Sequence, residues 1–512
     1  MPTRLPTTYL AVLTALAGVL GSGCVRKNFF QPDARLDASL PLPATADSVR
    51  GATAGRQYAR HGGLYHALVG RHNRPTWAAP VSAPILRLPT ARPGGLRPGK
   101  VGGGFNSTSL TLTPPSGPAY VLRTVDKDPI RATPTVLRGT FLVNVLRDNI
   151  SATNPYGSLV VAPLAQAAGV PHATPRLVYV RPDDPAFQTD SLRLFRGQLA
   201  YLEEKAAVDI GTPAGSRGGT TSTTKAFEAV FASPTHRIDQ AAMLRARLLD
   251  GWLGDWDRHE GQWNWGLSQP TPTGTVLLTP LPKDRDMVFY RLDDGVLGWL
   301  VGHVFLRHWV TFKPEFQNAT ALLSSGHYLD VRALNGLSRG QFRAIALAMQ
   351  RQWPDTLIER ALRRMPPAAF ALEGPRLIKA LQARRADLPA LANGFYEHLA
   401  RRPVVGGTVQ AERVEVHRYR DSTVVAMSAL GGSTPLYRRV FFPSETRVIR
   451  LEGLGGNDVF VVQEHDKQVR SAPRVHLYGG AGTDEIRGTA RGVRFSQETV
   501  KPKRAYDLPP TE

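Results

Sequence analysis

The 512-residue sequence predicts an α+β protein in which a large mixed domain precedes a small β-rich domain. Four short strand patterns occur among helical stretches in the first part of the chain, at about 107–113, 119–126, 176–180 and 197–203. From Arg402 onward, apolar and polar residues alternate over short runs bounded by turns, which is typical of strands with one buried face. We therefore place a domain boundary next to Arg402.

The elements follow one another in a clear order. Residues 25–55 are rich in proline, alanine and aspartate, and we expect them to be a tether. The mixed domain covers 56–400, the β-rich domain 401–495, and a tail 496–512. Within the mixed domain, leucine, isoleucine and alanine recur at helical spacing at about 134–150, 158–168, 241–255, 338–363 and 374–400.

The basic excess of the chain does not indicate a nucleic-acid partner. The formal net charge is +21, from 63 lysines and arginines against 42 acidic residues. A basic excess suits nucleic acid, anionic lipid or phosphorylated ligands. No run of five or six basic residues is present, and no zinc-finger, basic-zipper or RNA-recognition signature. Solvated surface arginines are the simpler explanation.

The single cysteine, Cys24, follows a short apolar stretch near the N-terminus. Tyr9–Leu20 is too short to span a bilayer as a helix, and the small residues 21–23 follow it. This order resembles a lipobox, although a glycine stands where a lipobox usually has leucine. The resemblance implies a lipoprotein signal peptide at 1–24, export, and anchoring in membrane lipid through an acylated Cys24. The alternative is a secretory peptide cleaved nearby. One cysteine also excludes a disulfide framework.

Two basic or glycine-rich segments near the start of the mixed domain could hold phosphate groups. Gly102, Gly103 and Gly104 precede a strand, and glycines let backbone N–H groups approach an anion. Three glycines are also common in a plain turn. Arg123 lies near the end of the next strand and Lys127 just beyond it, and either cation could contact a nucleotide phosphate. The alternative for this pair is a surface salt bridge with a neighbouring aspartate.

Two acidic segments follow in the second half of the mixed domain. The first, GDWDRHEGQWNW, contains Asp257, His259 and Gln262 directly after a helical stretch. The second follows an apolar strand about 27 residues later and contains Asp284 and Asp286. Carboxylates are suited to Mg²⁺, which takes oxygen ligands from one or two carboxylates and from phosphate. The alternative is a pair of solvated acidic turns.

These segments carry a family resemblance. The spacing at Asp257 resembles the D-x-H-x-x-N catalytic loop of atypical kinases, among them the HipA-type kinases, the type II phosphatidylinositol 4-kinases and the secretory-pathway kinases. The segment 280–289 resembles the I-P-W-D-x-D segment of CotH-type spore-coat kinases, and 199–204 resembles the hinge strand of the same families. The resemblance covers about residues 100–300, and it implies a two-lobed kinase-like fold for 56–400.

By this resemblance the chain is a phosphotransferase that uses ATP and Mg²⁺. Asp257 and His259 would be the catalytic residues of the loop, with Asp257 orienting the acceptor hydroxyl and taking its proton. Asp284 and Asp286 would bind the metal. Gln262 stands where these families place a metal-binding asparagine, and its carbonyl oxygen lies one carbon further out.

A longer stretch, 58–484, is similar to a recurrent region of large bacterial outer-membrane proteins. In those proteins it accompanies a calcineurin-like phosphoesterase domain or a surface-antigen barrel, and neither is found in this sequence. The resemblance implies an outer-membrane location and a separately encoded barrel partner. Because a protein outside the cytoplasm meets little ATP, the alternative function is a non-catalytic pseudokinase scaffold that binds such a barrel.

Two glycine turns in the β-rich domain suggest calcium. The segments 453–460 and 479–486 resemble the G-G-x-G-x-D-x-U-x repeat of RTX proteins, in which aspartates and turn carbonyls bind Ca²⁺. Asp458 and Asp484 would be the ligands. A stack of such turns generally needs at least three repeats, and two are present. The alternative for these turns is a purely structural role. If they do bind calcium, the alternative function for the whole chain is a calcium-binding surface protein.

Overall fold

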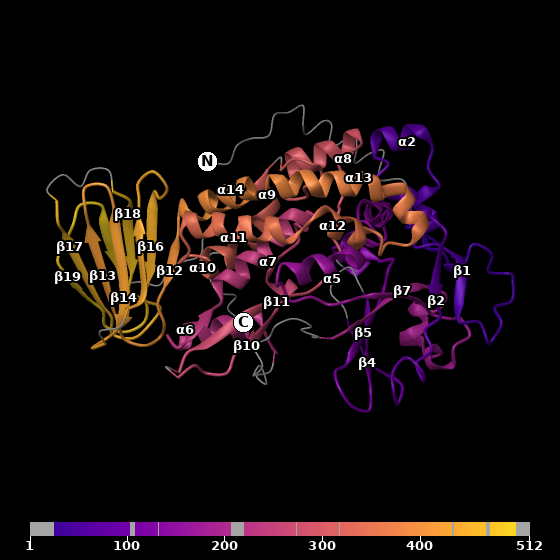
Figure 1. The fold of residues 1–512 in the computed structure, drawn as a ribbon, viewed down its shortest axis with the longest axis horizontal. Helices are drawn as coiled ribbons and strands as arrows, with labels where there is room; N and C mark the ends of the chain where they lie inside the picture. Colours follow the sequence, from indigo (N-terminus) through magenta and orange to yellow (C-terminus); the bar gives the residue numbers. More distant parts are fainter. Residues whose placement is uncertain are drawn as a thin grey trace.

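The computed structural model describes residues 25–102, 108–131, 133–205, 220–272, 274–316, 318–432, 435–466 and 472–497. Helices and strands are mixed, as predicted. Figure 1 shows strands at one end of the molecule, a helical middle, and a block of strands from the C-terminal part of the chain at the other end.

An antiparallel sheet of five strands carries the first half of the site. In spatial order its strands are β3 (Arg97–Gly102), β4 (Ser109–Thr113), β5 (Tyr120–Thr124), β7 (Leu199–Glu204) and β6 (Arg176–Tyr179). Leu110, Leu122 and Leu202 lie opposite one another and pack into an apolar cluster on one face. Because side chains alternate along a strand, Arg123 and Glu203 emerge on the other face. The four strands predicted in this region are confirmed, with small shifts at their ends.

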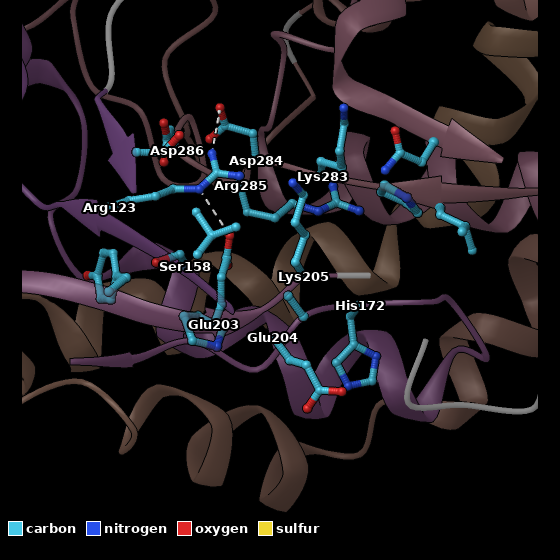
Figure 2. Close-up of a pocket in the computed structure, with 18 of the residues that line it drawn as sticks. Arg123, Ser158, His172, Glu203, Glu204, Lys205, Lys283, Asp284, Arg285 and Asp286 are labelled. Carbon is cyan, nitrogen blue, oxygen red and sulfur yellow. Dashed lines mark ion pairs between the residues drawn. The ribbon is translucent and has the colours of Figure 1, made fainter. Parts of the chain in front are cut away.

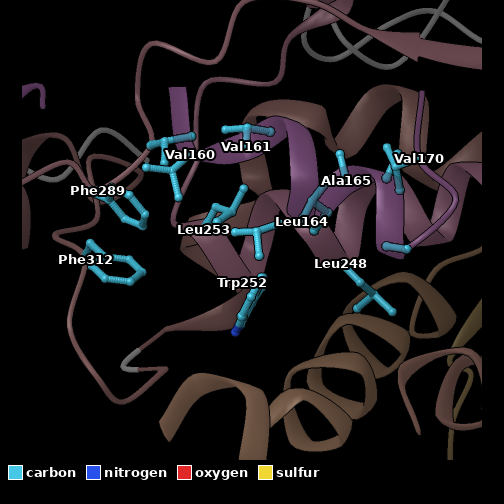
Figure 3. Close-up of a cluster of buried hydrophobic side chains, with 14 of the residues drawn as sticks. Val160, Val161, Leu164, Ala165, Val170, Leu248, Trp252, Leu253, Phe289 and Phe312 are labelled. Carbon is cyan, nitrogen blue, oxygen red and sulfur yellow. The ribbon is translucent and has the colours of Figure 1, made fainter. Parts of the chain in front are cut away.

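The helical middle is built around two buried helices, α5 (Gly157–Ala167) and α7 (Gln240–Leu253). Figure 3 shows Val160 and Leu164 of α5 packed with Leu248 and Trp252 of α7. The indole of Trp252 stacks on that of Trp353 at 3.8 Å between ring centroids. The other helices of eight residues or more are α4 (Leu142–Asn149), α6 (Thr223–Ala232), α11 (Arg339–Gln352), α12 (Asp355–Leu362), α13 (Pro367–Ala386) and α14 (Leu388–Ala400).

Short helices connect these elements. The short α-helices are α2 (Gly63–Leu68), α3 (Arg74–Ala78), α8 (Val296–Leu300), α9 (Ala319–Leu323) and α10 (His327–Ala333). The 3₁₀ turns are η1 (Arg56–Ala59), η2 (Pro129–Arg131), η3 (Thr135–Leu137), η4 (Ile150–Ala152), η5 (Pro185–Phe187), η6 (Asp190–Phe195), η7 (Glu260–Gln262) and η9 (Ser324–Gly326), and η8 (Val301–Phe305) is a π-turn.

Prolines divide two helices that the sequence predicts as continuous. The stretch 338–363 becomes α11 and α12, with Pro354 between them. The stretch 374–400 becomes part of α13 and all of α14, with Pro389 in the first turn of α14. Proline disfavours helical backbone at the residue before it but is tolerated in a first turn, so a new helix begins at each of these points.

A second sheet lies beside α7. Its four strands, in spatial order, are β8 (Thr220–Ser222), β10 (Trp263–Leu267), β11 (Val276–Pro282) and β9 (His236–Ile238). β10 and β11 are antiparallel, with Trp263 opposite Pro282. The residues just before β10 and just after β11 therefore lie next to each other, which brings the two acidic segments of the sequence together.

Residues 25–55 differ from the tether that their composition suggests, because they pack on the mixed domain. β1 (Ser48–Ala52) pairs with β2 (Val81–Pro84). Ala34 is fully buried, and the buried Asp33 accepts a hydrogen bond from the Tyr179 hydroxyl at 2.9 Å. The buried polar contacts fix this segment in place, which composition alone could not indicate.

The C-terminal strands form two facing sheets with an apolar core between them. One contains β12 (Val404–Gly406), β16 (Val448–Glu452), β18 (Arg474–Tyr478) and β20 (Val493–Ser496), all parallel. The other contains β15 (Pro435–Phe441), β14 (Thr423–Ala429), β13 (Glu412–Arg418), β17 (Val459–Glu464) and β19 (Glu485–Arg487). A buried ion pair of 2.8 Å between Arg332 of α10 and Glu452 of β16 joins these sheets to the helices.

Candidate active site

A cavity of about 460 Å³ lies between the five-stranded sheet and the loop that follows β11. We call it the site cavity. Its walls come from β3, β4, β5 and β7, from α5, and from the residues 281–286. The polar face of the sheet and the end of β11 thus line the same cavity. Figure 2 shows Arg123 in this cavity, between Glu203 and Asp284.

Arg123 is the strand cation that lines the site cavity. Its Nε lies 3.0 Å from a carboxylate oxygen of Glu203 on the neighbouring strand β7, and one of its terminal nitrogens lies 3.5 Å from Asp284 Oδ2. The guanidinium therefore bridges the sheet and the loop after β11. Burial raises the pKa of Glu203, and the positive charge of Arg123 partly offsets this effect.

Lys127 lies beyond the end of β5 and forms an ion pair with Asp286. Its pKa is lowered, mainly by burial, while the negative charge of Asp284 acts in the opposite direction. Lys127 borders a smaller hollow next to the site cavity. The sequence left Arg123 and Lys127 as alternatives, and in the structure both reach the loop after β11, with Arg123 alone in the wall of the site cavity.

Asp284 has an open carboxylate oxygen. Its backbone is left-handed, with a φ of 51°, a conformation that aspartate tolerates better than most residues and that is common at functional sites. Burial by itself would raise the pKa of Asp284, but the positive charges of Lys127 and Arg123 hold it below its ordinary value. Oδ1 is buried and has no hydrogen-bond partner among the described residues. A partly buried carboxylate that favours its ionised form and has an oxygen without a hydrogen-bond partner is suited to a cation.

The loop that carries Asp257 begins where α7 ends. Gly254 closes the helix in the left-handed conformation, with a φ of 73°, so the chain turns sharply toward β10. Asp257 is half-buried. Burial raises its pKa, and the negative charge of Asp284 raises it further. The charge of His259 acts in the opposite direction. Carboxyl groups whose pKa is perturbed in this way are common at functional sites.

His259 and Gln262 occupy different positions in this loop. His259 is exposed, and its Nδ1 accepts a hydrogen bond of 3.0 Å from the backbone of Gly261, so it caps the turn η7. We find no contact between His259 and the site cavity among the described residues. Gln262 is partly buried, and its side chain helps to lower the pKa of Asp284. Asp284 and Gln262 are thus close enough to act on one ion.

Arg258 ties the two acidic loops together, and sequence reasoning missed it. Its guanidinium is fully buried and donates to the backbone carbonyls of Lys283 at 2.6 Å, Asp284 at 3.0 Å and Gln262 at 3.2 Å. It also lies 3.3 Å from the carboxylate of Asp250 on α7. One side chain therefore fixes the backbone of both candidate metal ligands, Gln262 and Asp284.

Further buried charges support Arg258. Arg285 pairs with Asp250 and with Asp255, and Arg247 pairs with Asp250 at 3.0 Å and with Asp330 at 2.8 Å. Burial raises the pKa of Asp255 to about 6, against the effect of its arginine neighbours. The available signal was the position of Arg247 and Asp250 among the apolar residues of α7, because charges on the buried face of a helix need partners.

The glycine loop is only partly described. Gly102 ends β3 and lines the site cavity. Gly103 and Gly104 lie outside the described residues. Three lysines, Lys100, Lys205 and Lys283, also line the cavity, so basic groups surround it on several sides.

The residues present fit a magnesium ion held jointly with phosphate. Asp284 offers the open oxygen, and Gln262 lies beside it. Asp286 is engaged by Lys127 and is the less available of the two predicted carboxylates. Within the described residues, no group of three or more histidine, cysteine or acidic side chains could hold a metal. Mg²⁺ is commonly bound by one or two carboxylates plus substrate phosphates, so such a group is not required.

The two glycine turns stack on each other, but their aspartates are used by the backbone. Asp458 Oδ1 accepts from the backbone N–H of Glu412 at 2.8 Å, and Asp484 Oδ1 accepts from that of Asp458 at 2.9 Å. Gly453 and Gly479 leave room for the carboxylates, since a Cβ there would lie about 2 Å from the oxygens of Asp458 and Asp484. These contacts use one oxygen of each aspartate, whereas Asp458 Oδ2 is buried and has no hydrogen-bond partner among the described residues. Calcium at these turns therefore stays a prediction.

The lipid-anchor prediction falls outside the described residues, because these begin at residue 25 and Cys24 precedes them. Among the helices that are described, none is both long enough and apolar enough to cross a bilayer.

No protein-family model matches the chain, and no curated protein matches its sequence. Two solved protein kinases align with part of the chain, both at TM-scores below 0.5. The Helicobacter pylori proinflammatory kinase CtkA aligns with 59% of this chain and 95% of its own length, at 12% identity and a TM-score of 0.33. The Rio2 kinase of Chaetomium thermophilum, solved as an ADP/Mg²⁺-phosphoaspartate complex, aligns with 57% of this chain and 71% of its own, at 13% identity and a TM-score of 0.20.

Proposed function

We propose that the chain is a phosphotransferase that binds a nucleotide in the site cavity. The observation that carries this proposal is a convergence at one cavity. A cation from a strand, Arg123, meets the partly buried carboxylate of Asp284, whose Oδ1 has no hydrogen-bond partner among the described residues. Arg258 fixes the loop of Asp257, which is not part of the cavity wall, to the backbone of Asp284. A volume of about 460 Å³ is within the range of small-molecule sites, about 300–1,000 Å³.

The charges in the site cavity are suited to phosphoryl transfer. In that reaction a protein mainly positions the phosphates and neutralises their charge. Arg123, Lys205 and Lys283 line the cavity and can contact phosphate oxygens. Asp284 and Gln262 would hold Mg²⁺, which would neutralise further charge on the phosphates when bound.

Asp257 would act on the acceptor. It is half-buried beside the cavity loop, and its raised pKa makes it a stronger proton acceptor than an exposed aspartate. It would orient the acceptor hydroxyl and take its proton as the new phosphoester bond forms, while the bond between the β- and γ-phosphates breaks and the nucleoside diphosphate leaves. His259 caps the loop instead of facing the cavity, so we assign it a positioning role.

A non-catalytic pseudokinase scaffold is the second candidate, and one feature favours it. Kinases pair their strand lysine with a glutamate on a helix of the same lobe. α5 carries no acidic residue, and Arg123 takes its partners from β7 and from the loop after β11 instead. Such a scaffold would bind a partner, and an outer-membrane barrel protein is the partner that the sequence resemblance favours.

The experiment that separates enzyme from scaffold uses Asp257→Ala in the full chain. Asp257 forms no ion pair with Arg123, whose partners are Glu203 and Asp284, so the variant should still bind Mg²⁺-nucleotide. Autophosphorylation and nucleotide turnover should fall by about 10²–10⁴-fold, the usual cost of removing a positioned base. If wild type binds nucleotide and the variant turns it over equally fast, Asp257 is not the base.

We also propose that the chain is exported and anchored in the cell envelope through an acylated Cys24. The support is the order of the apolar stretch, the small residues and the cysteine in the sequence. An anchor at this point would lie one residue before Val25, whose backbone N–H already donates to Gly139 at 3.3 Å. The folded part would therefore stand directly on the membrane, without a spacer.

A further inference from the structure

An apolar patch is exposed on two short helices outside the site cavity. The exposed fractions are 77% for Leu64, 63% for Val296, 51% for Trp299 and 50% for Phe305. We define the apolar patch as the exposed apolar side chains of α2, α8 and η8: Leu64, Leu68, Val296, Trp299, Val304 and Phe305. Clusters of this kind on a folded surface usually mark an interaction site.

Close backbone packing makes these helices one surface. A Cβ on Gly295 would lie 2.4 Å from the backbone nitrogen of Gly70, and one on Gly298 would lie 3.3 Å from the carbonyl of Val69. The start of α8 is therefore pressed against the end of α2, and Figure 1 shows the two helices side by side at one edge of the molecule. The Trp299 ring stacks on that of His303 at 4.8 Å between centroids, which restrains its orientation.

The charged side chains within the two chain segments that carry the apolar patch are all basic, and the acidic groups packed against them are paired: Asp148 with Arg74 and Asp294 with Arg291. The stretches 60–71 and 295–309 contain no aspartate or glutamate, and they contain three exposed arginines, Arg60, Arg71 and Arg307. The nearest acidic residues along the chain, Asp293 and Asp294, pair with Lys313 and Arg291. Tryptophan, phenylalanine and leucine next to unopposed arginines are the composition of surfaces that lie at a membrane interface.

The start of the described chain lies on an adjacent element. Arg26 N–H donates to the side chain of Asn144 on α4 at 2.9 Å, and Asp148, one helical turn further along α4, accepts from the hydroxyl of Tyr65 on α2 at 2.7 Å. One turn of helix is about 5.4 Å. A lipid attached at Cys24 would thus enter the bilayer close to α2.

We infer that the apolar patch inserts into the interface of a phospholipid bilayer with anionic headgroups. Trp299 and Phe305 enter at the level of the upper acyl chains, and the three arginines contact the headgroups. The inference goes beyond the proposed phosphotransferase and does not depend on it. The occupant that we propose for the apolar patch is lipid, so binding of a protein partner on this face in place of lipid would contradict the inference.

The test uses tryptophan fluorescence of the membrane-bound full chain. Of the eight tryptophans, Trp299 is the one that is more than half exposed; Trp77, Trp252, Trp256, Trp263, Trp265 and Trp353 are buried, and Trp309 is partly buried. The protein is reconstituted into vesicles of phosphatidylcholine and phosphatidylglycerol whose acyl chains carry bromine near the headgroup. We expect quenching of wild type, and at least a twofold smaller quenched fraction in Trp299→Phe.

Matched variants distinguish insertion from a general change. Phe305→Ser should reduce the quenching of Trp299, because it removes an apolar side chain that we propose to enter the bilayer together with Trp299. Phe442→Ser replaces a similarly exposed phenylalanine just after β15 and should leave quenching unchanged. Absence of quenching in wild type, or equal quenching in wild type and Trp299→Phe, would overturn the inference and leave the patch to a protein partner.

Discussion

At the scale of single residues, Asp284 and Asp458 show two uses of a buried carboxylate. Asp284 is kept ionised by neighbouring cations and has an oxygen without a donor, so it is ready to bind an ion. Asp458 has no cation beside it, and burial together with the charges of Glu412 and Asp484 raises its pKa to about 7. Both carboxylates keep one buried oxygen without a hydrogen-bond partner, so the cations beside Asp284 are what distinguish the two residues.

The raised pKa of Asp458 predicts a pH dependence of stability. Its ordinary value is 3.8, so between about pH 4 and pH 7 the folded state holds a proton that the unfolded state has lost. This contribution to the free energy of unfolding falls as pH rises through that window and is constant above it. Asp458→Asn removes this titration. The difference in free energy of unfolding, variant minus wild type, should therefore be larger at pH 8 than at pH 5.

Urea unfolding of the two proteins at both pH values measures this effect. The comparison between variant and wild type cancels the other buried acids, such as Asp126, whose pKa burial also raises to about 7. A stability difference that is the same at pH 5 and pH 8 would mean that Asp458 is ionised in the folded protein across this range.

At the scale of elements, Arg258 joins the loop before β10 to the loop after β11. Arg258→Lys keeps the charge but loses the fork that reaches three carbonyls. We expect a loss of about 1–3 kcal/mol in stability from the unpaired carbonyls. We also expect weaker Mg²⁺-dependent nucleotide binding at a temperature where both proteins are folded, because the backbone of Asp284 is no longer held.

Arg384→Lys is the matched control for that prediction. Arg384 is also a buried arginine that donates to backbone carbonyls, those of Trp252, Gly251 and Lys313, away from the site cavity. It should lower thermal stability and leave the nucleotide dissociation constant unchanged. If both variants weaken nucleotide binding equally, Arg258 contributes only to stability.

The sequence predicted those elements whose signal is local. Four strands of the five-stranded sheet were predicted from their local pattern, whereas β3 was not, and the acidic loops were found because Asp257 and Asp284 each adjoin an apolar element. The arginine network could not be predicted in the same way, because Arg247 and its partner Asp330 are 83 residues apart. The tether was misjudged for the same reason, since Asp33 is bound by Tyr179 from across the fold.

At the scale of the whole molecule, the proposals combine an anchor, a membrane face and a site cavity. The apolar patch and the start of the described chain lie on adjacent elements, while the cavity is formed by the five-stranded sheet and the loop after β11. A chain held at both Cys24 and the patch would have a fixed orientation on the bilayer, with no spacer between anchor and fold.

The anchor itself is tested by Cys24→Ala. The acylation that we propose needs the cysteine sulfur, so the variant should leave the membrane fraction or accumulate as the unprocessed chain. Wild type should carry a metabolic lipid label that the variant lacks. Membrane fractionation without any label on wild type would show that binding does not depend on a lipid at Cys24.

The central claim is that Asp284 makes the site cavity a Mg²⁺-dependent nucleotide site, and calorimetric titration of ATP into the full chain tests it most directly. We predict binding by wild type in Mg²⁺ and a loss of at least tenfold in affinity in Asp284→Asn, which keeps the side-chain size but removes the charge. In EDTA the two proteins should bind equally weakly. No heat of binding by wild type with Mg²⁺ or Mn²⁺, or the same affinity in both proteins with Mg²⁺ present, would contradict the account.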